Sequence, residues 1–156
     1  MLERSYMKIW VDADACPKIV KELLFKSCLR LEIPICLVAN SYMNVPFHKL
    51  ISFVKVESGD DVADMYIANH IAPEDLVVTA DIPLAAQVVE KGTVAINPRG
   101  ELYDDENIGE RLSMRDFMKD LRDSGVVTGG PEPFGAKDKE NFANSLSKIL
   151  AQKGYK

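Results

Sequence analysis

Two aspartates stand at the end of the first apolar run of the sequence. Ile9-Trp10-Val11 is followed by Asp12-Ala13-Asp14, and an apolar stripe with helical spacing begins after Pro17. This pattern is typical of a buried parallel strand that delivers acidic side chains to the carboxyl edge of a sheet and then leads into a helix. Ligands of open α/β sheets bind at that edge. The pattern therefore predicts a site there.

Other aspartates occupy comparable places further along the chain. Asp61 and Asp64 stand at the start of a helical pattern and, three residues apart, share one face of it. Asp81 follows the apolar run at residues 76–78. If the first and fourth strands are neighbours, Asp12 and Asp81 converge at one edge of the sheet. We therefore expect these four side chains to face a common pocket.

Several carboxylates in one pocket cannot all stay ionised without a cation. Oxygen ligands of this kind suit Mg²⁺ or Mn²⁺. Such ions activate water and hold the oxygens of a phosphoryl group, often as a pair of metals about 3.5–4 Å apart. The competing interpretation is structural, because aspartate commonly caps helices and turns. A cap is the simplest interpretation for Asp14 and Asp60 in particular.

A second enzyme class fits part of the pattern. In haloacid-dehalogenase-type phosphatases, an Asp-x-Asp motif after an apolar strand supplies a nucleophile and a general acid, as Asp12 and Asp14 would here. The segment 59–64 also resembles the later acidic motif of those enzymes. That motif should follow a lysine motif and lie near the end of the chain, whereas here it precedes two further strands. The order therefore argues against this class.

The length and the composition of the chain are those of a single domain with a sizeable hydrophobic core. It has 156 residues, of which 47% are hydrophobic and 28% charged. No apolar run approaches the ~20 residues of a membrane span, and the first six residues lack the apolar core of a signal peptide, so we expect a cytoplasmic protein. The net charge of −5 argues against a general nucleic-acid binder. It becomes +1 without the six clustered aspartates, which are Asp12, Asp14, Asp60, Asp61, Asp64 and Asp81.

Apolar strands that alternate with helical stripes predict an α/β fold with a mostly parallel central sheet of about five strands and helices on both faces. We expect one domain over residues 7–152, after a short extension over residues 1–6. The expected strands cover residues 7–12, 33–39, 53–56, 75–80 and 93–96. The expected helices cover residues 17–31, 60–71, 82–91, 113–124 and 136–152, with a short helical segment at 47–51 and a Gly/Pro-rich loop at 125–135.

Longer motifs surround the candidate residues. They are Val11-Asp12-Ala13-Asp14-Ala15-Cys16-Pro17, Val38-Ala39-Asn40, Gly59-x-Asp61-x-Ala63-Asp64, Thr79-x-Asp81-Ile82-Pro83-Leu84-Ala85, Arg99-Gly100, Asn107-Ile108, Arg115-Asp116 and Gly129-Gly130-Pro131-x-Pro133-Phe134. In this combination the chain resembles the YaiI/YqxD family of uncharacterised bacterial proteins, from Met7 to the last helix. Lys139 stands where that pattern has arginine, which is a minor departure.

The resemblance implies a PIN-like nuclease fold, whose relatives are metal-dependent ribonucleases. In those relatives an aspartate ends the first strand, acidic residues lie on a central helix, and an aspartate follows a Thr/Ser-x pair after the fourth strand. The resemblance assigns these roles to Asp12, to Asp61 and Asp64, and to Asp81 with Thr79. It supplies no activity, because the family itself is uncharacterised and kinship alone does not establish chemistry.

Further residues are candidates for substrate binding. Asn40 and Arg99 follow the second and fifth strands, on the same edge of the sheet. Arg99 can bind a phosphate through two hydrogen bonds or form a structural salt bridge. The backbone N–H groups of Gly129 and Gly130 can hold an anion or belong to a flexible loop. Cys16 stands at a helix start, which favours a thiolate, or is simply a small residue in a tight turn.

These observations lead to a functional hypothesis with alternatives. We expect a divalent-metal-dependent nuclease that hydrolyses phosphodiesters of RNA or another nucleic acid. Its metal ligands would be Asp12, Asp61, Asp64 and Asp81, while Thr79 and Asp14 would orient the ligands or the attacking water. A non-catalytic RNA- or protein-binding module and a small-molecule phosphatase are the alternatives.

Overall fold

A computed structural model describes residues 6–59, 61–126, 129–130 and 132–155. In this part of the chain, one sheet has the strand order β3-β2-β1-β4-β5-β6. Its strands are β1 (Ile9–Asp12), β2 (Ile35–Ala39), β3 (Ile51–Lys55), β4 (Leu76–Val78), β5 (Val94–Ile96) and β6 (Leu102–Tyr103). The helices are α1 (Lys18–Leu31), α2 (Val62–His70), α3 (Ile82–Glu90), α4 (Ile108–Asp123) and α5 (Ala136–Gln152).

Strand β1 lies at the centre of the sheet. It pairs in parallel with β2 on one side and with β4 on the other, and Val11 is in register with both Leu37 and Val78. The chain builds outward from β1 to β3, then crosses to β4 and builds outward in the other direction. The strand order therefore reverses beside β1, and such a reversal opens a crevice at the carboxyl ends of the strands.

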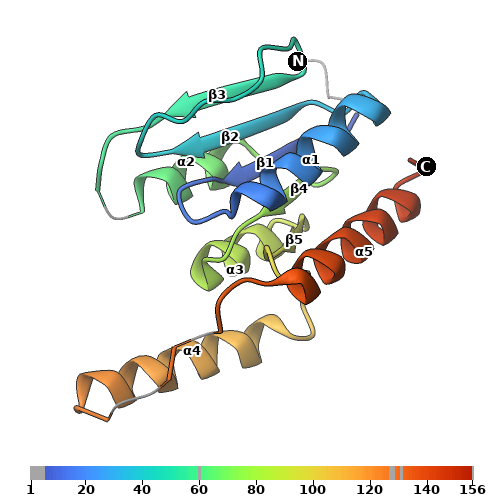
Figure 1. The fold of residues 1–156 in the computed structure, drawn as a ribbon. Coiled ribbons are helices and arrows are strands. Elements are labelled where there is room, and N and C mark those ends of the chain that lie inside the picture. The colour runs from blue at the N-terminus through green and yellow to red at the C-terminus, as the bar shows by residue number, and fades with distance from the viewer. Residues whose placement is uncertain (1–5, 60, 127–128, 131, 156) are drawn as a thin grey trace.

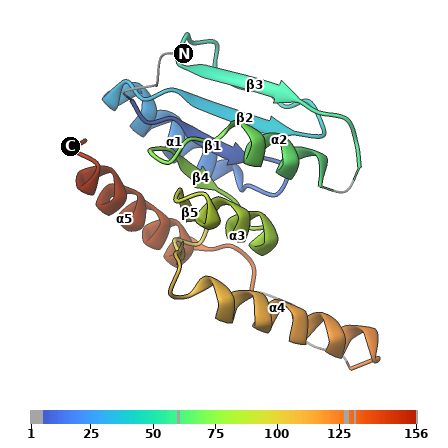
Figure 2. The same cartoon turned by 180° about the vertical axis from the view of Figure 1, so that it is seen from behind.

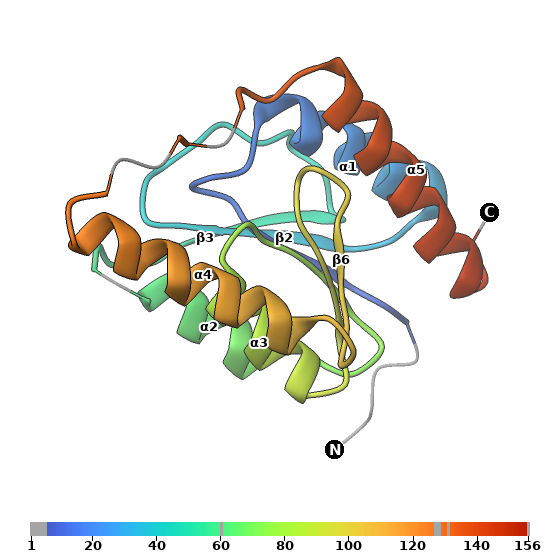
Figure 3. The same ribbon diagram turned by 90° about the horizontal axis from the view of Figure 1, so that it is seen from below.

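Helices cover both faces of the sheet. Helices α1 and α5 lie on one face, and α2 and α3 lie on the other (Figures 1, 2 and 3). Successive residues of a strand point to opposite faces. Ile9 and Val11 therefore belong to the core beneath α1 and α5, whereas Trp10 belongs to the core beneath α2 and α3. The expected α/β class, with a mostly parallel sheet between helices, is confirmed.

Helix α5 is held close to the turn that follows β5. Gly100 in that turn has a φ of +89°, and a Cβ there would lie 2.6 Å from the backbone carbonyl of Asn141 in α5. The Ser145 hydroxyl donates a hydrogen bond of 2.7 Å to the carbonyl oxygen of Gly100. Phe142 of the same helix is fully buried. Close backbone approach and apolar burial together fix α5 against the sheet.

Helix α4 lies beyond α3, on the side of the molecule away from β3 (Figures 1 and 2). None of its residues is buried, and the side chains of Met114 and Phe117 are 56% and 57% exposed. The helix contacts α3. The structure therefore leaves most of the apolar stripe of this helix at the surface.

Some expected elements differ from the observed ones. The antiparallel strand β6 was not expected, and residues 47–51 are not helical. Instead, the amide of Leu50 donates to the His48 imidazole in a turn that leads into β3. Helix α4 begins five residues earlier than expected, after a turn in which the Asp104 carboxylate accepts from the Asn107 amide.

A further expectation concerns the start of helix α2. Asp60 was the expected N-cap of the helix, but it lies outside the described residues. The residue that precedes α2 is Asp61, whose side chain makes no capping hydrogen bond.

Within the described ranges, no helix combines the length and the hydropathy that a membrane span requires.

Candidate functional site

A polar pocket of about 580 Å³ opens at the carboxyl edge of the sheet, beside the point where the strand order reverses. Its carboxylates come from the end of β1, the turn after it, the start of α2 and the start of α3. The residues that line it are Asp12, Asp14, Asn40, Gly59, Asp61, Ala63, Asp64, Asp81, Arg115 and Lys119. We call this cavity the aspartate pocket. The structure thus brings together every aspartate of the expected metal site.

Thr79 organises two of these aspartates. It is buried directly after β4, and its hydroxyl donates a hydrogen bond of 2.8 Å to Asp12 Oδ2 on β1. The same hydroxyl oxygen accepts from the backbone N–H of Asp81 at 3.0 Å. Asp81 in turn caps α3, because its Oδ1 accepts from the amide of Leu84 at 2.8 Å. One side chain therefore sets the relative position of the β1 and α3 carboxylates.

Asp14 and Asn40 close the pocket on the β2 side. The Asp14 carboxylate accepts a hydrogen bond of 2.8 Å from the backbone N–H of Asn40. The side-chain oxygen of Asn40 is buried and has no hydrogen-bond partner among the described residues. Buried polar atoms are nearly always paired, so this oxygen is available to a ligand or an ordered water. Asp14 acts here as a support for the loop after β2.

Asp61 and Asp64 enter the pocket from the start of α2. Asp61 has a φ of +68°, a left-handed conformation that costs a non-glycine residue about 1–2 kcal/mol. Its side chain does not offset this cost by stabilising the helix, since it forms no capping hydrogen bond. Strained residues of this kind cluster at functional sites. Asp64 lies in the first turn of the helix and is half-buried.

Burial and neighbouring carboxylates raise the pKa of Asp64 and of Asp12. Burial, followed by the charges of Asp81, Asp12 and Asp61 and a hydrogen bond with Asp81, raises the pKa of Asp64 from 3.8 to about 7. Burial also raises the pKa of Asp12, and the nearby charges of Asp81 and Asp14 add to this, while the Thr79 hydrogen bond opposes it. The pocket therefore favours a bound positive charge, either a proton or a metal ion.

Two cationic side chains of α4 also line the aspartate pocket. Arg115 and Lys119 are four residues apart, so they lie on one face of the helix. Both are exposed, and Arg115 Nη1 lies 3.2 Å from Asp116 Oδ1. The sequence-based site did not include this pair. Their i,i+4 spacing was a visible signal, but only the packing of α4 beside α3 brings them to the carboxylates.

The donor set suits a hard divalent cation, although its ligands are not preassembled. Among the described residues, no group of three or more Asp, Glu, His or Cys side chains is arranged to hold a metal ion. Two of the carboxylates also have hydrogen-bond roles within the protein, since Asp12 accepts from Thr79 and Asp81 caps α3. The donors are nevertheless carboxylate oxygens, which are the ligands that Mg²⁺ and Mn²⁺ prefer.

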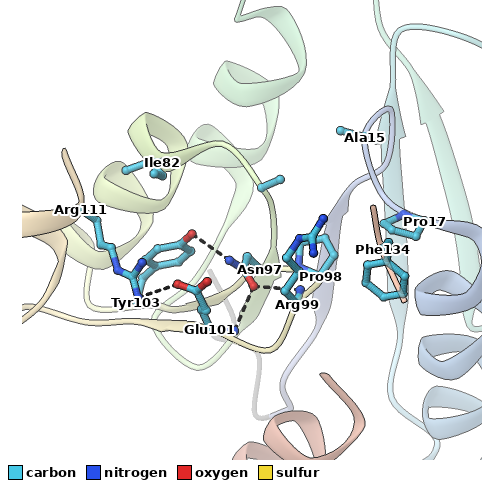
Figure 4. Close-up of a pocket in the computed structure, with 11 residues that line it drawn as sticks. Ala15, Pro17, Ile82, Asn97, Pro98, Arg99, Glu101, Tyr103, Arg111 and Phe134 are labelled. Carbon is cyan, nitrogen blue, oxygen red and sulfur yellow. Dashed lines mark hydrogen bonds and ion pairs between the residues drawn. The ribbon is translucent and has the colours of Figure 1, made fainter. Parts of the chain in front are cut away.

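A second cavity, of about 480 Å³, adjoins the aspartate pocket (Figure 4). The same chain segments form part of the wall of both cavities, because neighbouring residues of these segments line different cavities. Asp14 and Asp81 line the first cavity, whereas Ala15, Ala80 and Ile82 line the second. The other lining residues of the second cavity are Pro17, Asn97, Pro98, Arg99, Glu101, Tyr103, Arg111 and Phe134. We call it the tyrosine pocket.

The remaining candidates lie outside the aspartate pocket. Arg99 lines the tyrosine pocket, and its guanidinium forms a salt bridge of 2.9 Å with Asp138 and donates to the carbonyl of Glu132. Gly129 and Gly130 are exposed and line neither of the two cavities.

Cys16 is buried, and burial raises the pKa of its thiol to about 12. Its thiol is therefore protonated at neutral pH, and the interpretation as a small residue in a turn is the better one.

Comparisons with known proteins place these residues in a family. The model of the family described as "Uncharacterized BCR, YaiI/YqxD family" matches residues 10–152. A UPF0178 protein of Shewanella sp. (strain ANA-3) is 61% identical over 145 residues, which are 93% of this chain and 97% of the relative. A UPF0178 protein of Geobacter metallireducens is 56% identical over 146 residues, which are 94% of each chain. No solved structure matches the chain.

The matched range runs from Trp10 in β1 to the end of α5, so it includes both cavities and every candidate site residue. The identity and the coverage exceed what chance similarity produces. The chain therefore belongs to the YaiI/YqxD family of bacterial proteins.

Proposed function

We propose that this protein is a PIN-like, divalent-metal-dependent nuclease that hydrolyses phosphodiester bonds in RNA. The observation that carries the proposal is the gathering of five aspartates from separate segments in one pocket at the carboxyl edge of the sheet. A purely structural cluster of this size is destabilising, because burial, together with the neighbouring carboxylates, raises the pKa of Asp64 to about 7. Function is the usual reason for such a perturbed group in a cavity.

Asp12, Asp61, Asp64 and Asp81 are the proposed ligands of Mg²⁺ or Mn²⁺. When bound, the ion supplies a nucleophilic water of lowered pKa and neutralises charge on the phosphoryl oxygens. The hydroxyl of Thr79 holds the Asp12 carboxylate in place at the centre of this ligand set. Asp61 is exposed and Asp64 is half-buried, so both side chains are able to turn toward an incoming ion.

Two features support a nucleic acid as the substrate. Arg115 and Lys119 line the rim of the aspartate pocket from α4, and exposed cations of this kind hold phosphates that flank the reacting one. The aspartate pocket is also wide and polar, which suits a chain that passes through more than a small molecule enclosed on all sides. The overall charge of −5 limits nonspecific binding elsewhere on the surface.

The test compares wild type with Asp12→Asn on one labelled RNA, each in Mn²⁺ and in EDTA. The substitution keeps the shape of the side chain and its hydrogen bond from Thr79, but it removes one negative charge. We expect the wild type to cleave only with Mn²⁺, and the variant to lose most of this turnover. RNA affinity in EDTA should hold or improve, because a charge that repels phosphate is gone.

Other outcomes assign the protein differently. RNA binding without metal-dependent cleavage by either protein would leave a non-catalytic binding module. Hydrolysis of phosphate monoesters in place of RNA would point to a small-molecule phosphatase. Cleavage that survives both the substitution and EDTA would come from a contaminant, and the nuclease proposal would be abandoned.

A further inference from the structure

The tyrosine pocket is almost neutral, although two arginines line it. The guanidinium of Arg111 forms an ion pair with Glu101, and that of Arg99 forms one with Asp138. Glu101 and the two arginines are the only charged residues among the described ones that line this cavity. Because both guanidinium groups are already neutralised, the cavity is poorly suited to a phosphate. Its charge balance favours an uncharged ligand.

One hydrogen-bond donor in this pocket remains available. Tyr103 is only 3% exposed, and its hydroxyl oxygen accepts from Asn97 Nδ2 at 3.2 Å (Figure 4). Among the described residues, no group accepts the hydrogen of this hydroxyl. Asn97 is held by its own contacts, since its side-chain oxygen accepts from the amides of Arg99 and Glu101 at 2.9 Å each. The pocket thus presents a buried donor on a rigid support.

Much of the rest of the wall is apolar. The side chains of Pro17, Pro98, Ile82 and Phe134 line the cavity around Tyr103. A volume of about 480 Å³ lies within the range of small-ligand sites and accommodates a purine or a pyrimidine with its ribose. Apolar walls with a few placed polar groups are the usual environment of a planar heterocycle, which offers an apolar face and polar edges.

The position of the cavity then suggests its role. The segments 14–15 and 80–82 separate it from the aspartate pocket by the thickness of one chain. A nucleotide with its phosphate over the carboxylates can therefore place its base on the other side of that ridge. We propose that the tyrosine pocket binds the nucleobase next to the reacting phosphate, with the Tyr103 hydroxyl donating to an acceptor on the base edge. This inference rests on the proposed nuclease function.

The test measures binding of uncharged nucleosides in EDTA, so it does not depend on metal or on catalysis. Adenosine, guanosine, cytidine and uridine are titrated separately into the protein and followed by calorimetry or by NMR. We expect at least one of them to bind the wild type. Tyr103→Phe, which removes only the hydroxyl, should weaken that binding about 2- to 12-fold, the range of one neutral hydrogen bond. Ala15→Phe, at an exposed position on the wall, should fill the cavity and abolish binding.

The matched control is Tyr155→Phe, which removes the hydroxyl of a tyrosine that lines a different cavity, together with Glu74 and Lys153. It should bind nucleosides as the wild type does. Absence of binding by the wild type tighter than about 1 mM would overturn the inference. So would binding that is unaffected by both Tyr103→Phe and Ala15→Phe.

A further variant separates the two proposals. Asp12→Asn should bind nucleosides normally in EDTA, because Asp12 lines only the aspartate pocket. If RNA is cleaved with Mn²⁺ but no nucleoside binds, the base pocket fails and the nuclease stands. If nucleosides bind as described but no metal-dependent cleavage occurs, the nuclease fails and the pocket stands as a nucleoside site.

Discussion

The Thr79 hydroxyl donates a 2.8 Å hydrogen bond to Asp12 Oδ2, across 67 residues of sequence and between the adjacent strands β4 and β1. Because its oxygen also accepts from the amide of Asp81, one buried side chain links two aspartates of the pocket. The Thr79 hydrogen bond lowers the pKa of Asp12, against the larger effect of burial, which raises it. The Thr79 hydroxyl therefore favours the charged form of Asp12 and fixes the orientation of the Asp12 carboxylate.

Thr79→Val should destabilise the protein and weaken its response to metal. Valine keeps the shape of threonine but leaves the Asp12 carboxylate without its donor and the amide of Asp81 without its acceptor. We expect the free energy of unfolding to fall by about 1.5–3 kcal/mol, as for hydrogen bonds to charged groups. Denaturation with guanidinium chloride in EDTA measures this loss, and melting curves with Mn²⁺ measure the metal response.

The control is Thr93→Val. Thr93 is also buried, and its hydroxyl donates to the carbonyl of Ala72 at 3.1 Å, far from any carboxylate of the pocket. Its substitution should cost about 1 kcal/mol and leave the shift in melting temperature with Mn²⁺ as in the wild type. Equal metal responses for the two variants would show that Thr79 does not position a metal ligand.

Asp64 should make stability depend on pH in the absence of metal. Its pKa in the folded protein, about 7, lies above its ordinary value of 3.8. Between about pH 4 and pH 7, the folded state thus holds a proton that the unfolded chain has lost, and the free energy of unfolding falls as the pH rises. Asp64→Asn should flatten this decline and be more stable than the wild type at pH 7.5, as measured by denaturation in EDTA at several pH values.

Addition of Mn²⁺ should reverse the same penalty. A cation bound by the wild type neutralises the pocket, so the melting temperature at pH 7.5 should rise. The rise should be smaller for Asp64→Asn and unchanged for Asp105→Asn, which alters an exposed aspartate that does not line the pocket. Equal rises in all three proteins would mean nonspecific binding of the metal.

Arg115 and Lys119 should contribute to RNA affinity through charge alone. Replacing both with alanine should weaken RNA binding in EDTA and reduce the slope of log affinity against log salt by about 0.7 for each lost phosphate contact. The matched control removes two exposed cations outside the aspartate pocket, in Arg122→Ala with Lys148→Ala. If both double variants lose affinity equally, Arg115 and Lys119 do not guide the substrate any more than other exposed cations do.

Gly100 should tolerate no side chain. Its φ is +89°, and a Cβ would lie 2.6 Å from the backbone of Asn141, so Gly100→Ala must displace α5. We expect a loss of about 2–4 kcal/mol in the free energy of unfolding. Gly92→Ala is the control, because Gly92 has a φ of +80° but open space around it, and it should cost only about 1–2 kcal/mol. Similar losses in urea denaturation would mean that α5 adapts.

Much of the fold could be predicted from the sequence because burial leaves local patterns. The apolar runs before Asp12 and before Thr79 are strands with both faces covered, and such strands lack alternation. The helical stripe after Pro17 and that of α5 have the spacing of one buried face. Placing the carboxylates needed only one more rule, that parallel strands end at a common edge.

Other features depend on tertiary contacts that leave no local pattern in the amino-acid sequence. Strand β6 has two residues, which is too short for any periodicity, and it exists because its backbone pairs with β5. Helix α4 buries none of its residues, so its sequence contains no signal for the place where it packs. The approach of Arg115 to the aspartates follows from that packing alone.

The chain by itself determined which residues are the candidates for chemistry. The positions of aspartates at strand ends and helix starts can be read from the sequence, and Asp12 and Asp81 converge because β1 and β4 pair in parallel. The sequence also indicated Thr79 as a candidate for orienting the ligands, but only the tertiary structure decided that its hydroxyl donates to Asp12. Only the structure, likewise, decided that Asp61 adopts a left-handed conformation and that a neutral cavity lined by Tyr103 adjoins the carboxylates. These features require segments far apart in sequence to meet, and the free energy of such contacts depends on where the whole sheet places them.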